Sequence, residues 1–530
     1  MKTQYILTIA LLEAALVCSS SIAAVQTQNV ITAGDWPSVN HDANGSRYSA
    51  LKEIDSTNVG ALKKAGTYTF PDKEPSQTAP VVIDGVIYAT TAHTTVALDG
   101  FDCHVIWTHK WVSHGVETFN SQRGVAIADG KVVRGTPDGY LIALDPKDGH
   151  LIWEKQIADS KEGYFISMPP LINNGLIYIG PAGAEWASSG WVGAFRLSDG
   201  ERVWRFNIIP GDGEKGADTW GPNPETRKHA GGNLWTALSL DMEKGILYVP
   251  GGNPAPDIYD DERPGDNLYT DSLIALDAKT GRLKWYKQFI PHDVHDYDMT
   301  HVRIIKNGKH TLLAATGKDG LMRVLDADSH KIVYTVPFTS RMNTEAPLTT
   351  NSLRVSPSTL GGNEWNGPAY SPALGTIFVP ATDWSAKMKK DTTPPDAEKE
   401  HTHGWFFGGE TEFDPWEQAR GWLTAFDVAT GNIRWVYPAA KPLIGAVTAT
   451  AGNLVLTGEL TGDFLALDAG SGKVLYRENV GGPIGGGIVT YNAHNVQNVA
   501  VVSGFLGIFN TMAPALGGGN TTITVFRLSQ

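Results

Sequence analysis

A short segment near the middle of the chain concentrates side chains that could bind a cation or move a proton. It runs from Pro291 to Asp298 and contains two histidines and three aspartates. If the segment is extended, Asp296 and Asp298 point to the same face and bring two negative charges to one site. The residue types alone fit a polar loop or a structural zinc site. Zinc usually takes four tetrahedral ligands that often include Cys, so a zinc site is the less favoured interpretation.

Two further oxygen donors lie in glycine-rich turns. Glu185 follows Gly183 and Ala184, and Asn253 stands in the run Gly251-Gly252-Asn253-Pro254. Each of them, taken alone, is typical of a solvated loop carboxylate or a turn-forming amide. A hard cation needs several oxygen ligands, so these residues form a site only if the fold makes their loops converge.

An internal repeat predicts the elements that must position these loops. Each copy has a small residue, Leu or Phe, usually Asp, a turn with Gly, and a Trp or Tyr. Asp and Gly suit a tight turn, and the terminal aromatic suits a pleated face, so each copy predicts a β-hairpin. The seven copies run from residue 97 to 107, 143 to 153, 194 to 204, 275 to 285, 324 to 334, 425 to 435 and 466 to 476.

A second hairpin precedes several copies, as in the alternating stretch Ala79 to Tyr88 around Asp84-Gly85. Two hairpins make a four-stranded sheet. Most copies start 41 to 51 residues apart, which is typical of β-propeller blades. The longer spacings of 81 and 101 residues require insertions, and Pro254 to Asp271 and Ser385 to Gly421 are irregular and polar enough to supply them.

The two ends of the repeat predict how the ring closes. Val525 to Leu528 begins an eighth copy that stops before its last strand, and Leu62 to Phe70 is a strand without a sheet. Pairing these segments would remove the free edges. We therefore expect an all-β fold, an eight-bladed β-propeller in one domain over residues 25–530. Two sandwich domains are the alternative, but they leave the truncated copy unexplained.

Composition excludes several classes of protein. Hydrophobic residues make up 42% and charged residues 19%, which predicts a globular chain. The 43 basic and 56 acidic residues give a net charge of −13. Phosphate backbones require clustered Lys and Arg, so we expect no nucleic-acid partner.

The N-terminus is typical of a secretory signal peptide over residues 1–24. Lys2 precedes the mostly apolar run Ile6 to Val17, and small residues lead to Ala24. A buried N-terminal helix is the alternative. We expect a periplasmic or secreted protein with no membrane span after cleavage, because no other stretch has 18 uninterrupted apolar residues. Cleavage would remove Cys18 and leave only Cys103, so neither a disulfide nor a Cys-x-x-Cys-His haem site is expected.

The chain resembles the pyrroloquinoline quinone (PQQ)-dependent alcohol and sugar dehydrogenases from about residue 35 to 528. The resemblance implies an eight-bladed propeller that oxidises an alcohol or sugar hydroxyl in the periplasm, with a divalent or lanthanide cation on the propeller axis. The motifs that carry it are the repeated hairpins and the runs Asp35 to Pro37, Asn44 to Ser49, Ala182 to Glu185, Gly251 to Pro256 and Pro291 to Asp298.

The resemblance implies roles for the oxygen donors. Glu185 and Asn253 match the metal ligands, and Asp296 matches the catalytic aspartate that takes the hydroxyl proton. A carboxylate beside a cation keeps a low pKa and stays ionised. Asp298 could add a further negative charge to the metal site, which permits a lanthanide. The choice between Ca²⁺ and a lanthanide stays open.

The resemblance also implies the residues around the quinone. Lys318 would bind its oxygens and stabilise the charge that develops there, and Arg123 suits a PQQ carboxylate. Ser167 is expected at another carboxylate, and Trp235 is the expected stacking platform. The remaining residues expected at the cofactor are Gly183 and Ala184, with Gln77 where many relatives have Glu and Glu364 where some have Asn.

The chain also departs from the family pattern. Ser113 to Glu117 replaces the adjacent cysteines found over the cofactor, and Gly485 to Gly487 replaces a late tryptophan. We expect an open glycine roof and a roomier mouth, which suits a sugar, polyol or polymer end. The aromatic residues between Lys387 and Gly421 suit either a lid or partner surface, or simple packing on the scaffold.

Two classes of function follow from these patterns. The first is a periplasmic PQQ-dependent alcohol, polyol or sugar dehydrogenase that passes electrons to a separate cytochrome c or quinone. The second is a non-catalytic propeller scaffold of the kind used in outer-membrane assembly. The positions of Glu185, Asn253 and Asp296 favour the enzyme, because a scaffold needs no cofactor set.

Overall fold

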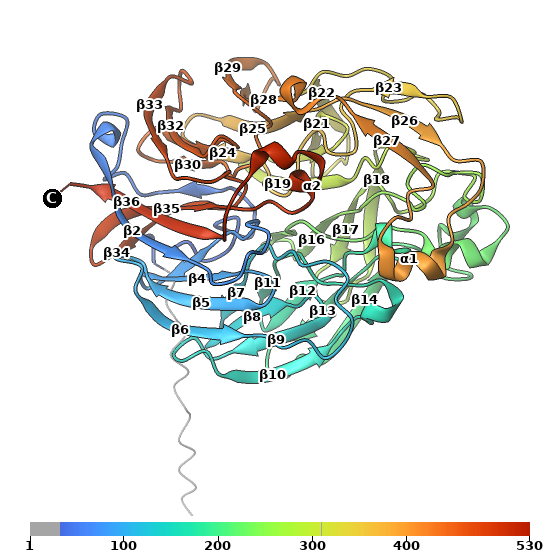
Figure 1. The fold of residues 1–530 in the computed structure, drawn as a ribbon, viewed down its shortest axis with the longest axis horizontal. Coiled ribbons are helices and arrows are strands. Elements are labelled where there is room, and N and C mark those ends of the chain that lie inside the picture. Colours follow the sequence, from blue (N-terminus) through green and yellow to red (C-terminus); the bar gives the residue numbers. More distant parts are fainter. Residues whose placement is uncertain (1–31, 309, 530) are drawn as a thin grey trace, which may run out of the picture.

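The computed structural model describes residues 32–308 and 310–529, and strands dominate these ranges. Figure 1 shows the sheets following one another in chain order around a common centre, from the blue strands β4 to β6 to the red strands β34 to β36. The signal peptide predicted at 1–24 lies outside the described residues. Within those residues, none of the helices has the length and apolar character needed to cross a membrane.

Eight sheets of the described chain contain four antiparallel strands, and in six of these sheets the four strands are consecutive in the chain. In one of them β1 (Tyr48–Ser49) adds a fifth strand, parallel to β30. The eight sheets are formed by β3 (Val81–Ile83), β4 (Val86–Thr90), β5 (Thr94–Asp99) and β6 (Val105–Lys110); β7 (Ala126–Ala128), β8 (Lys131–Gly135), β9 (Tyr140–Leu144) and β10 (Leu151–Gln156); β11 (Leu171–Asn173), β12 (Leu176–Ile179), β13 (Trp191–Arg196) and β14 (Arg202–Asn207); β15 (Ser239–Asp241), β16 (Ile246–Pro250), β17 (Ser272–Asp277) and β18 (Leu283–Gln288); β19 (Met299–Asn307), β20 (His310–Gly317), β21 (Leu321–Asp326) and β22 (Ile332–Pro337); β24 (Ala369–Ser371), β25 (Thr376–Asp383), β28 (Arg420–Asp427) and β29 (Ile433–Ala439); β30 (Thr448–Thr450), β31 (Leu454–Gly458), β32 (Asp463–Asp468) and β33 (Val474–Asn479); and β34 (Ile488–Ala493), β35 (Val496–Ser503), β36 (Thr522–Leu528) and β2 (Leu62–Thr69).

The insertion expected to be irregular at Ser385 to Gly421 is largely ordered, so that expectation is wrong. It contains β26 (Ala386–Lys390), α1 (Ala397–His403) and β27 (Gly409–Phe413), and β26 also pairs with β23 (Leu353–Val355). The pairing of β26 with β27 and with the distant strand β23 supplies the backbone hydrogen bonds that an isolated loop would lack. The other helices are α2 (Ile508–Met512) and the short 3₁₀ turns η1 (Val59–Ala61), η2 (Ser160–Glu162), η3 (Ala184–Trp186), η4 (Ala217–Trp220), η5 (Pro224–His229), η6 (Trp416–Gln418) and η7 (Pro514–Leu516).

The seven repeat copies form hairpins, as predicted, and each contains a bulge. In the first copy Ala97 pairs with Trp107 while Leu98 pairs with Val105, so one strand carries an extra residue. The same shift recurs in the other six copies. The bulge turns the final aromatic toward the neighbouring sheet.

The terminal aromatics join one sheet to the next. Trp107 Nε1 donates a hydrogen bond of 2.8 Å to Pro146 O in the following hairpin turn. Its ring lies against Gly149, where a Cβ atom would approach the ring to 2.5 Å. Corresponding bonds run from Trp153 to Leu197 O, Trp204 to Ala278 O, Tyr334 to Val428 O and Trp435 to Ala469 O. From the sequence we expected glycine only to provide the turn conformation. At Gly149, glycine is also required for close packing against the Trp107 ring.

The last sheet combines both ends of the described chain. β36 lies between β35 and β2, and Thr67 of β2 pairs with Thr524 of β36. The strand pairing expected between Leu62 to Phe70 and the C-terminal segment is therefore present. Tyr476, the aromatic of the preceding sheet, donates to Leu62 O over 3.4 Å, so this sheet receives the same kind of contact as the others.

Apolar side chains fill the spaces between neighbouring sheets. One cluster combines Val82 and Ile87 of the first sheet with Val502 and Val525 of the last. Inner strands such as β5 are buried on both faces, whereas the outer strand β6 alternates between exposed and buried residues. Neighbouring strands of each sheet run in opposite directions. The start of the first strand of a sheet therefore lies beside the end of its second strand. The connections at this end of the sheets carry the candidate site.

Candidate active site

Asp298 and Lys318 lie side by side because their strands are neighbours. β19 begins at Met299 and β20 ends at Gly317, and these two residues are paired. Asp298 therefore precedes one strand and Lys318 follows the other, and Lys318 N donates to Asp298 O over 3.0 Å. This antiparallel ladder fixes the two side chains at one end of the sheet.

The Lys318 ammonium lies between two carboxylates. Its Nζ atom is 2.8 Å from Asp296 Oδ1 and 2.7 Å from Asp298 Oδ2. All three side chains are buried. The condition considered from the sequence, an extended segment, is not met, because Asp296 has a φ of 59°. Both aspartates nevertheless reach the same ammonium group, so the two carboxylates share one site.

A third carboxylate, Asp257, was missed by sequence reasoning. One oxygen each from Glu185, Asp257 and Asp296 lie within 4.8 Å of one another. Asp257 is fully buried, and neither carboxylate oxygen has a hydrogen-bond partner. Its place four residues after Asn253, directly behind a Pro-Ala-Pro run, is the only feature of the sequence that could have pointed to it.

The charge balance of this cluster fits a bound cation. Burial raises the pKa of Asp296 well above its ordinary value, the neighbouring carboxylates act in the same direction, and Lys318 opposes them. Burial likewise raises the pKa of Asp257 and of Glu185. In the protein by itself, the one ammonium group does not offset the burial of several carboxylates. The low pKa expected for Asp296 beside a bound cation stays a prediction.

Trp235 forms a platform that two cations contact. Arg123 lies 5.0 Å from the centre of its ring and Lys318 lies 5.4 Å from it. Arg123 Nη1 also donates to Ser167 Oγ over 2.7 Å and to Trp235 O over 3.2 Å. Arg123 Nε is buried without a partner. The structure thus brings together four of the residues expected around a planar, anionic cofactor.

Glu364, Gln77 and Asn253 border this group in different ways. Burial raises the pKa of Glu364 to about 7, and its Oε1 atom has no hydrogen-bond partner. Gln77 Oε1 accepts a bond of 2.6 Å from Ser121 Oγ, two residues from Arg123. Asn253 joins the acidic residues through its backbone, which donates to Asp298 Oδ1 over 3.0 Å.

Glu185 is held on the 3₁₀ turn η3. Gly183 precedes the turn with a φ of 133°, and a Cβ atom there would approach Gly163 O to 2.3 Å, so only glycine fits. Ala184 is buried beside it. On the other side, Phe406 N donates to Glu185 O over 2.9 Å. Phe406 is packed on the scaffold, whereas Trp405 is exposed.

The expected open glycine roof is wrong. A Cβ atom at Gly485 would lie 2.5 Å from Leu506, and one at Gly487 would lie 2.5 Å from Ala79. All three glycines are buried. Gly485 O also accepts a bond of 2.6 Å from Trp365 Nε1. Glycine is needed at these positions for close backbone packing, so the triple glycine does not widen the mouth.

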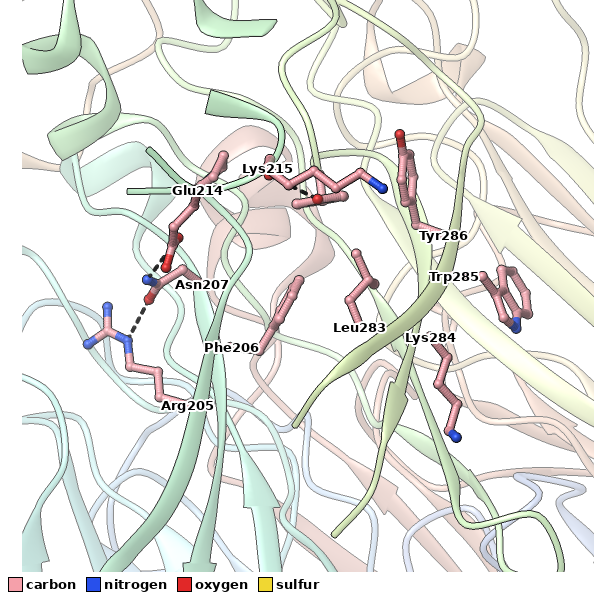
Figure 2. Close-up of a pocket in the computed structure, with 11 residues that line it drawn as sticks. Arg205, Phe206, Asn207, Glu214, Lys215, Leu283, Lys284, Trp285 and Tyr286 are labelled. Carbon is pink, nitrogen blue, oxygen red and sulfur yellow. Dashed lines mark hydrogen bonds between the residues drawn. The ribbon is translucent and has the colours of Figure 1, made fainter. Parts of the chain in front are cut away.

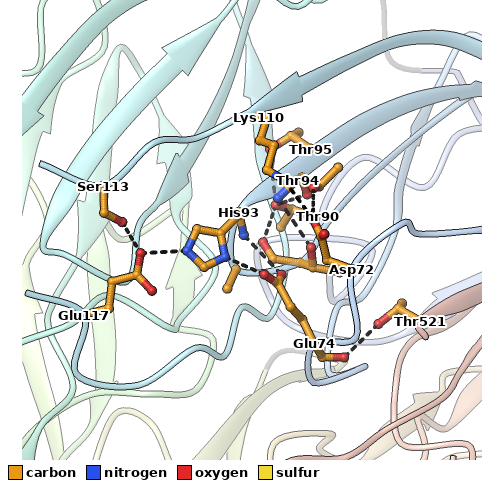
Figure 3. A network of polar contacts seen from close by, with 12 residues as sticks. Asp72, Glu74, Thr90, His93, Thr94, Thr95, Lys110, Ser113, Glu117 and Thr521 are labelled. Atoms are coloured by element: carbon orange, nitrogen blue, oxygen red, sulfur yellow. Dashed lines mark hydrogen bonds and ion pairs between the residues drawn. The ribbon is translucent and has the colours of Figure 1, made fainter. Parts of the chain in front are cut away.

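The segment 113–117, where the family pattern has adjacent cysteines and this chain has none, is held by a histidine. His93 Nε2 lies 2.7 Å from Glu117 Oε1, and its Nδ1 atom contacts Glu74 Oε1 (Figure 3). Hydrogen bonding to Glu74 is the largest cause that raises the pKa of His93, to about 9. The segment continues to Phe119, which packs on Trp186 with ring centres 5.4 Å apart. This ion pair is therefore connected to the turn that holds Glu185.

Two further features of the described chain, the histidines of the segment 291–298 and a pocket between two sheets, are alternative candidate sites. His292 contacts Asp260 over 3.0 Å, and neither it nor His295 joins a group that could hold zinc. A pocket of about 640 Å³ lies between β14 and β18 (Figure 2), and its lining includes Phe206 and Trp285. None of the acidic residues described above lines that pocket.

Comparison with known proteins adds an independent observation. The family model described as glucose/ethanol/alcohol dehydrogenase, β-propeller domain, PQQ, matches residues 36–340. The chain belongs to this family. The predicted resemblance to quinoprotein dehydrogenases is thereby confirmed, and the protein is an oxidoreductase of the PQQ-dependent alcohol dehydrogenase type. A second model, that of outer membrane protein assembly factor BamB, matches only residues 419–504.

Individual relatives support the same assignment over most of the chain. The quinohemoprotein alcohol dehydrogenase ADH-IIG of Pseudomonas putida is 30% identical over 91% of this chain and 74% of its own length. The quinoprotein alcohol dehydrogenase PedH, also of Pseudomonas putida, is 30% identical over 87% of this chain and 85% of its own. The solved structure of ADHIIG superposes with a TM-score of 0.87 over 94% of this chain and 80% of its own, at 28% identity.

Proposed function

We propose that this protein is a periplasmic quinoprotein dehydrogenase that oxidises the hydroxyl group of an alcohol, polyol or sugar. The observation that carries the proposal is the meeting of the Trp235 platform with the buried group of Lys318, Asp296 and Asp298. A propeller scaffold would have no use for buried carboxylates without partners, because each one costs free energy of folding.

The residues around Trp235 would hold PQQ. Trp235 offers a flat face, Arg123 and Ser167 offer donors to carboxylates, and Lys318 offers an ammonium group at the acidic side. Gln77, Glu364, Gly183 and Ala184 would line the remaining edges. The unpartnered Nε of Arg123 and Oε1 of Glu364 are polar atoms that a bound cofactor could satisfy.

The acidic residues would hold the cation and move the substrate proton. Glu185, Asn253, Asp296 and Asp298 supply oxygen ligands suited to Ca²⁺ or a lanthanide. PQQ, when bound, would supply the acceptor for the hydride that leaves the carbon carrying the hydroxyl group, and the cation would supply a Lewis acid beside the accepting carbonyl. Asp296 acts as general base and takes the hydroxyl proton on a carboxylate oxygen. Lys318 donates to Asp296 Oδ1 and so fixes the direction of that carboxylate.

The eight four-stranded sheets would form one propeller domain over residues 25–530. The pairing of β2 with β36 supports closure of the ring, because it leaves neither terminal strand as a free edge. Export through the signal peptide at 1–24 would place the enzyme in the periplasm. Without a Cys-x-x-Cys-His motif in this sequence, electrons would pass to a separate cytochrome c or quinone.

Reconstitution with PQQ and Ca²⁺ or La³⁺ tests this function by dye reduction on a panel of alcohols, polyols and sugars. Asp296→Asn should lower kcat by about 10²- to 10⁴-fold, the usual contribution of a general base. Asp266→Asn removes the same charge from an exposed position and should leave kcat unchanged. Absence of turnover with every metal, despite bound PQQ, would refute the enzymatic proposal.

A further inference from the structure

Asp257 lacks the partner that a buried carboxylate requires. It is fully buried, and both of its carboxylate oxygens are without a hydrogen bond. An ionised carboxylate in such surroundings is costly unless it is paired or coordinates a metal. The other acidic side chains of this cluster each form an ion pair with Lys318 or have a role in the family pattern, whereas Asp257 has neither.

The neighbouring cations are engaged elsewhere. Lys318 Nζ contacts Asp296 and Asp298. Arg263, six residues along the chain, gives its N–H groups to other acceptors instead. Nε donates to Pro256 O over 3.0 Å and Nη1 to Asn267 Oδ1 over 2.9 Å. Nη2 donates to the backbone carbonyls of Asp257 over 3.1 Å and Asp293 over 2.7 Å. Arg263 is therefore a positioning residue that fixes the backbone of Asp257 and leaves the carboxylate free to face Glu185 and Asp296.

The spacing of the three carboxylates fits one bound ion. Hard cations of the size of Ca²⁺ take oxygen ligands at about 2.3–2.6 Å. Two such ligands on opposite sides of an ion are separated by about 4.6–5.2 Å, so oxygens within 4.8 Å of one another can all reach the same centre. The ligand atoms of Glu185, Asp257 and Asp296 meet this condition.

We propose that Asp257 is a direct ligand of the cation in this site and that its charge makes the site prefer a trivalent ion to Ca²⁺. The carboxylates of Glu185, Asp257, Asp296 and Asp298 and the single ammonium of Lys318 leave a formal charge of −3. A divalent ion leaves one buried negative charge uncompensated, whereas a trivalent ion neutralises the group. This inference rests on the proposed metal site, but it assigns a ligand outside the set that the family pattern implies.

Terbium(III) binding tests the assignment without relying on turnover. PQQ-loaded wild type, Asp257→Asn and the control Asp261→Asn are titrated with Tb³⁺ by sensitised luminescence, with Ca²⁺ as competitor. Asp261 lies on the same connection but is exposed and pairs with Lys390. We expect Asp257→Asn to weaken Tb³⁺ binding by at least about tenfold, since even residues behind the ligands cost that much. Ca²⁺ binding should weaken less, and Asp261→Asn should match wild type.

Luminescence lifetimes in H₂O and D₂O provide a second measurement. Asp257→Ala should admit about one additional water to the bound Tb³⁺, because a removed ligand leaves a coordination position open. Unchanged Tb³⁺ affinity and water content in folded Asp257 variants would overturn the ligand assignment, and tighter binding of Ca²⁺ than of Tb³⁺ to wild type would overturn the preference. If the Asp257 variants lose Tb³⁺ while no substrate reduces the dye, the metal inference stands and the proposed oxidation fails.

Discussion

At the scale of single residues, the site contains more buried carboxylates than its cationic side chains pair with. Lys318 contacts two buried carboxylates, while Asp257 and Glu364 have oxygens without partners. Groups of this kind cost folding free energy and are usually retained for binding or catalysis. In the proposed function, the same residues that make the protein by itself less stable would hold the cofactor and the cation.

Glu364→Gln should reveal this cost as a pH-dependent change in stability of the metal- and cofactor-free protein. Burial raises the pKa of Glu364 to about 7. Between its ordinary value and pH 7, the unfolded chain releases a proton that the folded protein retains, so wild-type stability falls as pH rises to about 7. The free energy of unfolding of Glu364→Gln relative to wild type should increase by about 3 kcal/mol between pH 4.5 and pH 8. Urea unfolding at each pH measures this difference. A difference that does not vary with pH would contradict this.

The family resemblance, more than residue types alone, pointed to Asp296, Lys318, Arg123 and Trp235. The structure brings these four residues together. Asp257 was missed because an aspartate after proline is also an ordinary turn residue. Asp257 matters because three loops bring Glu185, Asp257 and Asp296 together. The spacing of these residues along the chain does not predict that contact.

At the scale of elements, the hairpin is the unit that repeats, and its turn glycine serves two purposes. Gly149 has a φ of 75° and lies against Trp107 of the preceding sheet. Positive φ was predictable from the turn type. The contact with the neighbouring sheet was not predictable. The alternation of residues along a strand shows which side chains share a face, but it does not show which side chains of another sheet they contact.

Gly149→Ala should therefore destabilise the fold more than a turn substitution without such a contact. Gly130→Ala is the matched control, since Gly130 has a φ of 68° and no atom within 4 Å of an added Cβ. Both variants carry the left-handed strain, but only the first displaces an indole ring. We expect Gly149→Ala to lower the free energy of unfolding by about 1–3 kcal/mol more than the control does. Equal losses in denaturant unfolding would contradict a packing role for Trp107.

At the scale of the whole molecule, the two ends of the described chain share one sheet. The truncated last repeat predicted this pairing, and β2 indeed lies beside β36. The insertion between β25 and β28 was less predictable. Its first strand, β26, pairs with β23, a segment more than 30 residues earlier. The irregular, polar composition of the insertion gave no indication of that long-range partner.

Thr524→Pro should uncouple the N-terminal strand from the rest of the sheet. Thr524 lies in β36 and pairs with both β2 and β35, so proline there removes a ladder hydrogen bond in a central strand. Amide exchange should accelerate across residues 62–69, and the unfolding temperature should fall. Thr524→Val is the control. The Thr524 hydroxyl is buried without a partner, so its removal should be neutral or stabilising. Unchanged exchange in β2 would contradict the coupling.

The ion pair of His93 affects how a pH–rate profile of this protein should be interpreted. Its pKa of about 9 means that the contact with Glu74 and Glu117 is complete below the ordinary histidine pKa and is lost as pH rises through about 9. The segment it fixes continues through Phe119 to Trp186, beside Glu185. An alkaline limb in the rate could therefore report release of this segment instead of titration of a reacting group. Comparison with His93→Gln, which does not titrate, would separate the two.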